Sequence, residues 1–508
     1  MSVRMTIFRT LHLFRTHLIV FLTIATLPAL SNAQDRQYQL LGVNEYEAAD
    51  LLQYAAHAAI DQGDISGTFI AQIVEQLYHE DGYFLARARF DTGSQTIIVN
   101  EGQIASLHVE GVDADMYELI RSYVAPLLAD SAVSHSEVER ALMLVRDIET
   151  ITAVAELVTS PQDGTTQMRI IANEHLSNWG RVTLDTPSRD IGDAISANIE
   201  QNYYHLLTAG DLLRLNLQVT SNLENGNDKF LGSMAYRTPA GPAGGYIEAY
   251  AGTYTARHDA MGSLTSVDNS GNTAILAFGL PTIRTADRYG YVISELRYAQ
   301  TDIQSPIANT DENVAVASLI WIDGRITPNG NALEYAVSLS AGDQSDDPTS
   351  ADSFQYARVG LGWSTSTYVN QREINLDLQL LGQFSNDVLP GTENFVMGGH
   401  NINRGYDFGE LAGDNGLFIS GEISTADAIS LGRRFALAPF AFAEFGWVSS
   451  NTFTEQAATS EEGASIGLGF DFSWSNRLSG RFYAAMPLID GPVSRDDPAM
   501  YLSISRTW

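Results

Sequence analysis

Residues 374–380 read Ile-Asn-Leu-Asp-Leu-Gln-Leu, so every second side chain is apolar and those between are polar. Successive side chains of a β-strand point to opposite faces, so this pattern predicts a strand with one apolar and one polar face. The same alternation recurs at residues 213–220 and 333–340. Runs rich in Gly, Asn, Asp and Ser, such as residues 224–228, are typical of the turns between strands. Residues 175–508 are therefore dominated by predicted strands.

The first 33 residues have the features of a signal peptide for export. Three arginines precede an apolar run at residues 18–30, and the small residues Ser31 and Ala33 follow it. We expect cleavage after Ala33. An N-terminal membrane anchor is the alternative, but a run of about 13 residues is short for a span of about 20.

Composition narrows the class of protein further. The 508 residues include 29 Lys+Arg and 61 Asp+Glu, which gives a net charge of −32, and no cysteine. Binding to a phosphate backbone needs clustered cations, so we expect no nucleic-acid partner. An exported chain without cysteine also lacks disulfides, so its stability has another source.

A soluble β-sandwich or propeller alternates in the same way, so the alternation by itself leaves these folds open. Three observations favour a transmembrane antiparallel β-barrel for residues 175–508. The chain carries an export signal, Trp and Tyr recur near the ends of predicted strands, and the last predicted strand ends in Trp508. A closed barrel also leaves no backbone edge in lipid. At about 20 residues for a strand with its turn, this region holds roughly 16 strands.

Residues 34–174 differ from the strand-rich part, because they mix helical and strand periodicities and contain none of the six tryptophans. We interpret them as two tandem α+β modules, residues 34–102 and 103–174, each with a strand, two helices and two further strands. The first module has predicted strands at 38–43, 83–90 and 96–100 and helices at 46–60 and 69–80. The second has predicted strands at 104–109, 152–159 and 166–172 and helices at 116–128 and 134–148.

Three motifs resemble a known family. Residues 398–406 read Gly-Gly-His-Asn-Ile-Asn-Arg-Gly-Tyr, and Gly-Asp-Asn-Gly follows at 413–416. This resembles the Arg-Gly-Tyr/Phe loop of the BamA-type outer-membrane superfamily and of its two-partner secretion branch, the TpsB transporters that include FhaC, ShlB and the hemolysin activators. Residues 442–446, Phe-Ala-Glu-Phe-Gly, are similar to the Phe-x-Asp-x-Gly strand of that family. Residues 82–84 and 101–111 resemble the join between two polypeptide-transport-associated (POTRA) modules.

The resemblance implies a gating loop in the barrel lumen. Its cation is Arg404 and the carboxylate on the wall is Glu444, while Gly405 and Tyr406 shape the tip and Gly446 completes the wall motif. The remaining loop signature consists of Gly398, Gly399, Gly413 and Asp414. In a partly desolvated lumen, arginine suits this role better than lysine, because its planar guanidinium can form two parallel hydrogen bonds with a carboxylate.

Two positions depart from the family pattern. Glu444 replaces the usual aspartate, and Asn403 stands where the family has an aliphatic residue before the arginine. Both residues keep the pairing possible. The alternative is that Arg404 lies in an exposed loop.

The function implied by the resemblance is that of an outer-membrane pore. Its periplasmic modules would capture an exported, unfolded exoprotein, and the barrel would carry this passenger to the cell surface, as in two-partner secretion of hemolysins. Other expected partners are outer-membrane lipid and, during biogenesis, the barrel assembly machinery. An insertase of the same superfamily is the alternative, and a diffusion porin, which would have no periplasmic modules, is a remote one.

Enzymatic motifs are not found in the sequence. The chain has no cysteine nucleophile, no Gly-x-Ser-x-Gly elbow, no His-Glu-x-x-His helix and no phosphate-binding glycine loop. The acidic loop at 343–352 lacks the ligand spacing of a known calcium site. We therefore expect no catalytic residue, cofactor or metal site.

Overall fold

The computed structural model describes residues 38–128, 132–159, 165–175, 178–187, 193–222, 228–259, 266–304, 309–345, 350–426, 428–432, 434–452, 459–475, 477–492, 494 and 497–508. The expected signal peptide, residues 1–33, lies outside the described residues. The chain divides into two compact units, of which the first holds the N-terminal module and the second holds the other module and the barrel.

The first module contains, in chain order, β1 (Gln39–Leu41), α2 (Ala48–Asp61), α3 (Gly67–Glu80), β2 (Arg87–Asp91) and β3 (Thr96–Asn100). Its three strands lie in the order β1-β3-β2, with β1 parallel and β2 antiparallel to β3. The helices pack on this sheet through Val74, Tyr78 and other apolar side chains that are fully buried. Helix α3 begins after Ser66, whose side chain accepts a hydrogen bond from the backbone N–H of Phe69.

Glu101 ties the end of this sheet to the chain after β1. Its carboxylate accepts hydrogen bonds from the backbone N–H groups of Asn44 and Glu45, at 2.7 and 2.9 Å, and from the Tyr78 hydroxyl at 2.7 Å. Burial alone would raise the pKa of Glu101, but these hydrogen bonds outweigh burial and hold the pKa below its usual value.

The second module repeats this topology with β4 (Ile104–Glu110), α4 (Ala114–Val124), η2 (Ala125–Leu128), α5 (His135–Arg146), β5 (Ile151–Thr159) and β6 (Thr166–Glu174). Its sheet has the order β4-β6-β5, so β5 lies at an edge. The predicted pair of α+β modules is confirmed. None of the helices in the described part of the chain is long and apolar enough to cross a membrane.

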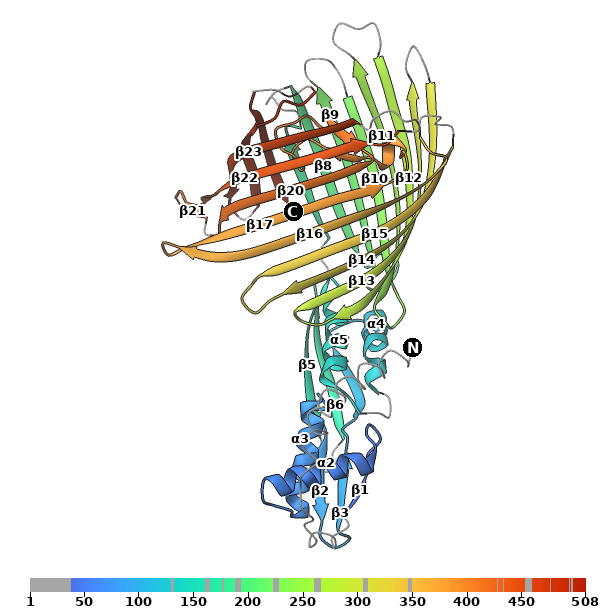
Figure 1. Ribbon diagram of the computed structural model, residues 1–508, viewed down its shortest axis with the longest axis vertical. Coiled ribbons are helices and arrows are strands. Elements are labelled where there is room, and N and C mark those ends of the chain that lie inside the picture. The colour runs from blue at the N-terminus through green and yellow to red at the C-terminus, as the bar shows by residue number, and fades with distance from the viewer. Residues whose placement is uncertain are drawn as a thin grey trace, which may run out of the picture. The chain divides into compact units, whose positions relative to one another are not determined.

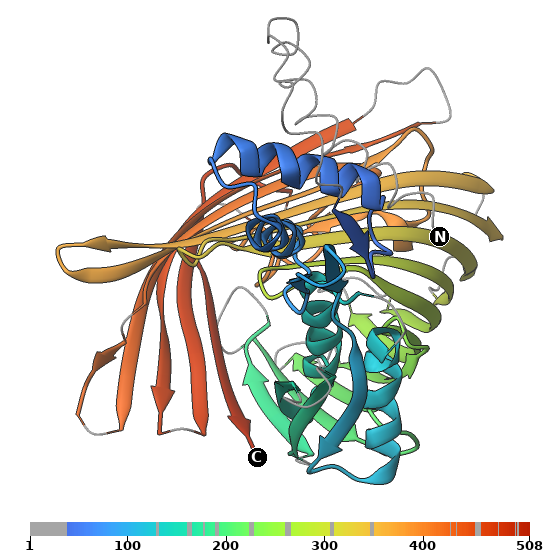
Figure 2. The same cartoon turned by 90° about the horizontal axis from the view of Figure 1, so that it is seen from below.

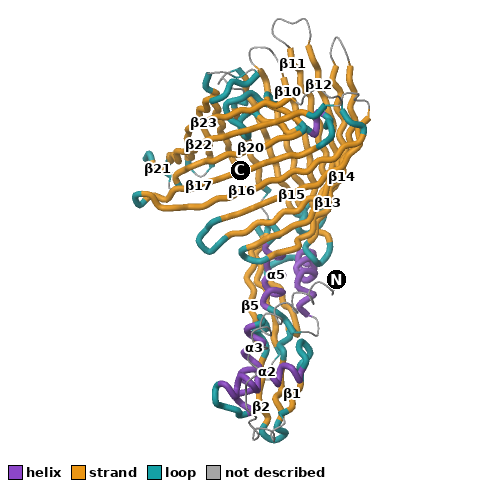
Figure 3. Tube along the Cα trace, in the orientation of Figure 1, coloured by secondary structure: helices purple, strands orange, loops and turns teal. Residues whose placement is uncertain are grey.

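The remaining strands close into an antiparallel barrel (Figures 1 and 3). Its strands are β7 (Trp179–Asp185), β8 (Ala194–Tyr204), β9 (Leu212–Asn222), β10 (Asp228–Ala240), β11 (Gly245–Asp259), β12 (Ser266–Arg284), β13 (Arg288–Gln304), β14 (Asn309–Ile326), β15 (Ala332–Ser345), β16 (Ser353–Val369), β17 (Arg372–Ser385), β20 (Asn415–Thr425), β22 (Phe435–Ser450), β23 (Thr459–Trp474), β24 (Leu478–Pro487) and β25 (Ala499–Thr507). The barrel closes where β25 pairs with β7, from Ser503 opposite Asp185 to Thr507 opposite Arg181. The described residues thus form sixteen main strands, with the two-residue β21 (Ile429–Ser430) beside β22, and the predicted barrel is confirmed.

The two faces of the barrel wall differ as the alternation predicts. Leu378 on β17 is half exposed and faces outward, whereas its neighbours Asp377 and Gln379 have the opposite orientation. On β22, Phe445 faces outward and Glu444 faces the lumen, where it is 5% exposed. Apolar side chains therefore cover the outside, and polar side chains line the inside.

Within its unit, the second module contacts the turns at one end of the first barrel strands. Arg140 on α5 donates hydrogen bonds to the carbonyl oxygens of Ala243 and Pro281, at 3.2 and 2.8 Å. Arg284 at the end of β12 forms an ion pair with Asp147, with Nε 2.7 Å from Oδ2. These contacts cover the ends of β10 to β12, and burial there lowers the pKa of Arg140.

Candidate functional site

A long loop, residues 386–414, connects β17 to β20 and folds back into the barrel. It contains η3 (Gly391–Glu393) and the short antiparallel pair β18 (Phe395–Met397) and β19 (Leu411–Gly413). The loop side chains of Met397, Tyr406 and Leu411 are at most 1% exposed and pack with Phe418 and Val448 of the wall. The loop is therefore packed against the inside of the barrel wall rather than lying in solvent.

Two glycines allow this close packing. Gly398 has φ +107°, and a Cβ atom on it would lie 1.9 Å from the carbonyl oxygen of Asp407, on the other side of the loop tip. Gly446 belongs to the wall, and a Cβ atom there would lie 2.5 Å from the sulfur of Met397. The other signature glycines, Gly399, Gly405 and Gly413, also lie in the loop.

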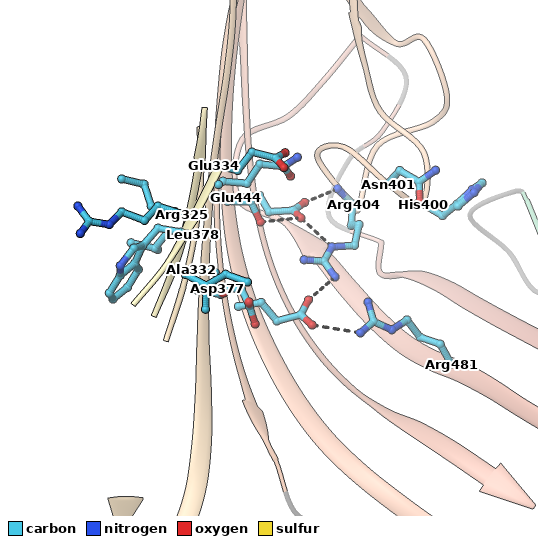
Figure 4. A pocket seen from close by; sticks show the side chains of 18 of the residues that line it. Arg325, Ala332, Glu334, Asp377, Leu378, His400, Asn401, Arg404, Glu444 and Arg481 are labelled. Carbon is cyan, nitrogen blue, oxygen red and sulfur yellow. Dashed lines mark hydrogen bonds and ion pairs between the residues drawn. The ribbon is translucent and has the colours of Figure 1, made fainter. Parts of the chain in front are cut away.

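Arg404 contacts two carboxylates of the wall. Its Nε lies 2.7 Å from Glu444 Oε1, its backbone N–H donates to Glu444 Oε2 at 2.5 Å, and its Nη1 lies 2.8 Å from Glu422 Oε2. The Arg404 and Glu444 side chains are 7% and 1% exposed. Figure 4 shows Arg404 reaching from the loop to Glu444 on the wall. The guanidinium carbon also lies 3.4 Å from the ring centre of Phe442, as in a cation–π contact.

A second arginine extends this network. Arg481 on β24 donates from Nη2 to Glu422 Oε1 at 3.1 Å and from Nε to Asp471 Oδ1 at 2.7 Å. Glu422 is thus shared by two guanidinium groups, and three carboxylates face two arginines. Sequence reasoning missed these roles of Glu422, Arg481 and Asp471. The alternation of β20 offered a signal, because Ile419 and Ile423 face outward and so place Glu422 inside.

A separate cluster holds the first half of the loop. Glu393 is 0% exposed and accepts hydrogen bonds from Arg297 Nη2, at 2.6 and 2.5 Å to its two oxygens, and from the Tyr356 hydroxyl at 2.8 Å. Its backbone carbonyl accepts from Arg358 and Gln383, at 3.1 and 2.9 Å. These partners lie on β13, β16 and β17, so the loop has two anchors on different parts of the wall. The sequence motifs did not indicate this second anchor.

Other residues of the expected site fix the ends of the loop. The Asp414 carboxylate accepts hydrogen bonds from the backbone N–H groups of Leu389 and Asn451, both at 2.6 Å. The Tyr406 hydroxyl donates to the carbonyl oxygen of Ile489 at 2.6 Å. Asn403 is buried with φ +58°, a left-handed conformation that asparagine tolerates better than most residues.

The comparisons with known proteins agree with this architecture. Residues 180–470 match the family described as haemolysin secretion/activation protein ShlB/FhaC/HecB. The chain belongs to this family. ShlB/FhaC/HecB proteins are two-partner secretion transporters, and this family is not enzymatic. The barrel therefore lies in the outer membrane, and the N-terminal modules lie in the periplasm. A transporter of this family works with a secreted partner protein.

Similar individual proteins are more distant. The heme/hemopexin transporter protein HuxB of Haemophilus influenzae strain 86-028NP is 20% identical, over 93% of this chain and 86% of its own. Among solved structures, CdiB from Acinetobacter baumannii has a TM-score of 0.74 at 15% identity, covering 99% of this chain and 98% of that one. CdiB from Escherichia coli also has a TM-score of 0.74, at 17% identity over 96% and 93% of the two chains. These structures share the fold.

Proposed function

We propose that this transporter captures one exported, unfolded polypeptide on its periplasmic modules and passes it through the barrel to the cell surface, and that the loop carrying Arg404 gates the path. The observation that carries the proposal is the position of this loop. It packs inside the lumen and is held there by buried ion pairs to Glu444 and Glu422. Ion pairs are discrete contacts, so a passenger that replaces them would weaken the hold of the wall on this part of the loop.

An exposed sheet edge supports the capture step. Strand β5 pairs with β6 along its whole length, and its other edge has no strand partner among the described residues. Val154 and Val158 on this strand are 61% and 52% exposed, so the sheet face beside this edge also presents apolar surface. A passenger that adds a strand here would gain backbone hydrogen bonds without requiring a particular sequence.

The test compares secreted and outer-membrane proteins of four strains: the wild type, a deletion, Arg404→Ala, and the control Arg214→Ala. Arg214 is also a barrel arginine, but it lies on β9, with Nε 4.0 Å from Glu200. We expect one exoprotein to disappear from the medium in the deletion and to fall strongly in Arg404→Ala, with the control unchanged. If many outer-membrane proteins fell together instead, the protein would be an assembly factor and the proposal would be wrong.

A further inference from the structure

Five arginines form a row at the periplasmic ends of the second half of the barrel. They stand at successive strand ends from β14 to β25, and all are exposed. We call this set the arginine rim: Arg325, Arg372, Arg434, Arg477 and Arg506. In the described part of the chain, none of the five forms an ion pair with a carboxylate.

The lack of carboxylate partners is unusual in this chain. Asp+Glu outnumber Lys+Arg by 61 to 29, and other barrel arginines do find carboxylates. Arg237 lies 2.7 Å from Glu248, and Arg288 lies 2.7 Å from Asp323. Where acids are this abundant, a row of exposed guanidinium groups without them is positioned for anions outside the chain.

The arginine rim faces the lipid side of the wall. Arg325 shares its face of β14 with Trp321, which is 43% exposed on the outside, and Figure 4 shows Arg325 across the strands from Arg404. By the same alternation, Arg506 shares the outward face of β25 with Ile504. Figure 2 shows the last, red strands ending side by side near the C-terminus. Arg434 and Arg477 occupy the adjoining turns, each immediately before a strand.

Each rim arginine also has an exposed apolar residue nearby. Leu333 is paired with Arg325 and Val369 with Arg372 on the outward face, and the exposed Leu431, Trp474 and Trp508 lie within three residues of the other three arginines. Tryptophan and tyrosine settle at the level of lipid headgroups, and arginine extends from the apolar zone to reach phosphates there. A soluble anionic polymer would leave these apolar side chains in water, whereas a membrane surface buries them.

We infer that the arginine rim binds the headgroups of anionic phospholipids in the periplasmic leaflet. Along the first half of the barrel, the second module occupies the periplasmic turns and Arg284 is paired with Asp147. The arginine rim belongs to the other half, so the barrel recruits anionic lipid asymmetrically. A juxtamembrane arginine near anionic lipid is worth about 1 kcal/mol, or roughly a fivefold preference for each contact.

The test reconstitutes the full-length protein in vesicles of phosphatidylethanolamine mixed with phosphatidylglycerol. Quenching of tryptophan fluorescence by brominated forms of either lipid reports their relative occupancy at the barrel surface, and Trp474 and Trp508 lie beside rim arginines. We expect about a fivefold preference for phosphatidylglycerol in the wild type. It should fall to about one when all five rim arginines become glutamine, and persist when they become lysine.

A matched control removes the same number of charges elsewhere. It changes five exposed cations to glutamine: Arg87, Arg89, Arg121, Arg146 and Lys229. This control variant should keep the preference for phosphatidylglycerol. A heat-dependent shift in gel migration is used to confirm that the barrel of each variant is folded. The inference is overturned if the wild type shows no preference or if the rim variant keeps it. Loss of exoprotein secretion with an unchanged lipid preference would instead assign the arginines to an acidic protein segment.

Discussion

Replacing Arg404 by alanine should weaken docking of the lumen loop. The change removes the contacts to Glu444 and Glu422 and leaves the Glu444 carboxylate, 1% exposed, without its cation. The backbone N–H of residue 404 still donates to it, and Ser420 and Ser465 remain near it, with Oγ atoms 3.3 and 3.4 Å away. Removing one partner of a buried pair costs about 3 to 5 kcal/mol. Undocking of the loop hydrates Glu444 and relieves this cost, so the undocked fraction should rise by at most about 100-fold to 4,000-fold.

A single cysteine can measure this equilibrium, because the chain has none of its own. Ser465 on β23 is 0% exposed, and a Cβ atom on Gly405 of the loop would lie 3.2 Å from its Cβ. Ser465→Cys is nearly isosteric, and its thiol can react with a maleimide only when the loop undocks from the wall. We call this variant the cysteine reporter. Its labelling rate should rise about 100-fold or more in Arg404→Ala and stay unchanged in Arg214→Ala.

Arg404→Lys should give an intermediate rate, since it keeps the charge but loses the forked contact with two carboxylates. Equal labelling rates with arginine, lysine and alanine would refute the reasoning, because the ion pairs would then contribute nothing to docking. A high rate already present in the wild type would show that the loop is not held at rest.

Three further predictions concern the loop and the first module. Gly446→Ala places a Cβ against Met397 and should make the free energy of loop docking less favourable by about 1 to 3 kcal/mol, so the cysteine reporter should be labelled faster. The control Gly362→Ala, whose Cβ would have no atom within 4 Å, should leave the labelling rate unchanged. Glu393→Gln removes the charge at the other anchor and should speed proteolysis within the loop by about tenfold or more; an unchanged rate would mean that this cluster does not hold the loop. Glu101 has a folded-state pKa below its unfolded value, so it stabilises the first module above about pH 4.3, and this stability is lost as pH falls through the folded pKa. Hydrogen exchange of that module in the full chain should thus be faster in Glu101→Gln than in the wild type at pH 7, with the difference vanishing in acid.

The barrel was predictable because each membrane-crossing strand repeats the same physical demand. Lipid on one side and water on the other impose a period of two, and residues 374–380 show it without a break within β17. The pattern is absent from part of a long strand. Residues 268–272 of β12 read Asp-Asn-Ser-Gly-Asn and offer no apolar face, so alternation marks only the rest of this strand.

The site was predictable only where a local motif existed. Arg404 and Glu444 belong to short motifs, and the resemblance paired them. Glu422 and Arg481 meet because β20, β22, β23 and β24 are neighbours in the sheet, which depends on register across four strands. Glu393 meets Arg297 over 96 residues of sequence. The residue pattern within one strand does not predict a contact between distant strands, so these contacts could be identified only from the structure.

The two departures from the family pattern act together in this loop. Asn403 adopts φ +58°, which an aliphatic β-branched side chain would resist, and the backbone then turns so that the N–H of Arg404 points at Glu444. Glutamate is one methylene longer than aspartate, and its two oxygens reach both this N–H and the guanidinium Nε. The longer carboxylate therefore holds the loop through its backbone as well as its side chain. Because that backbone contact survives any change of the arginine side chain, Arg404→Ala weakens docking of the loop but leaves one of its contacts to Glu444 in place.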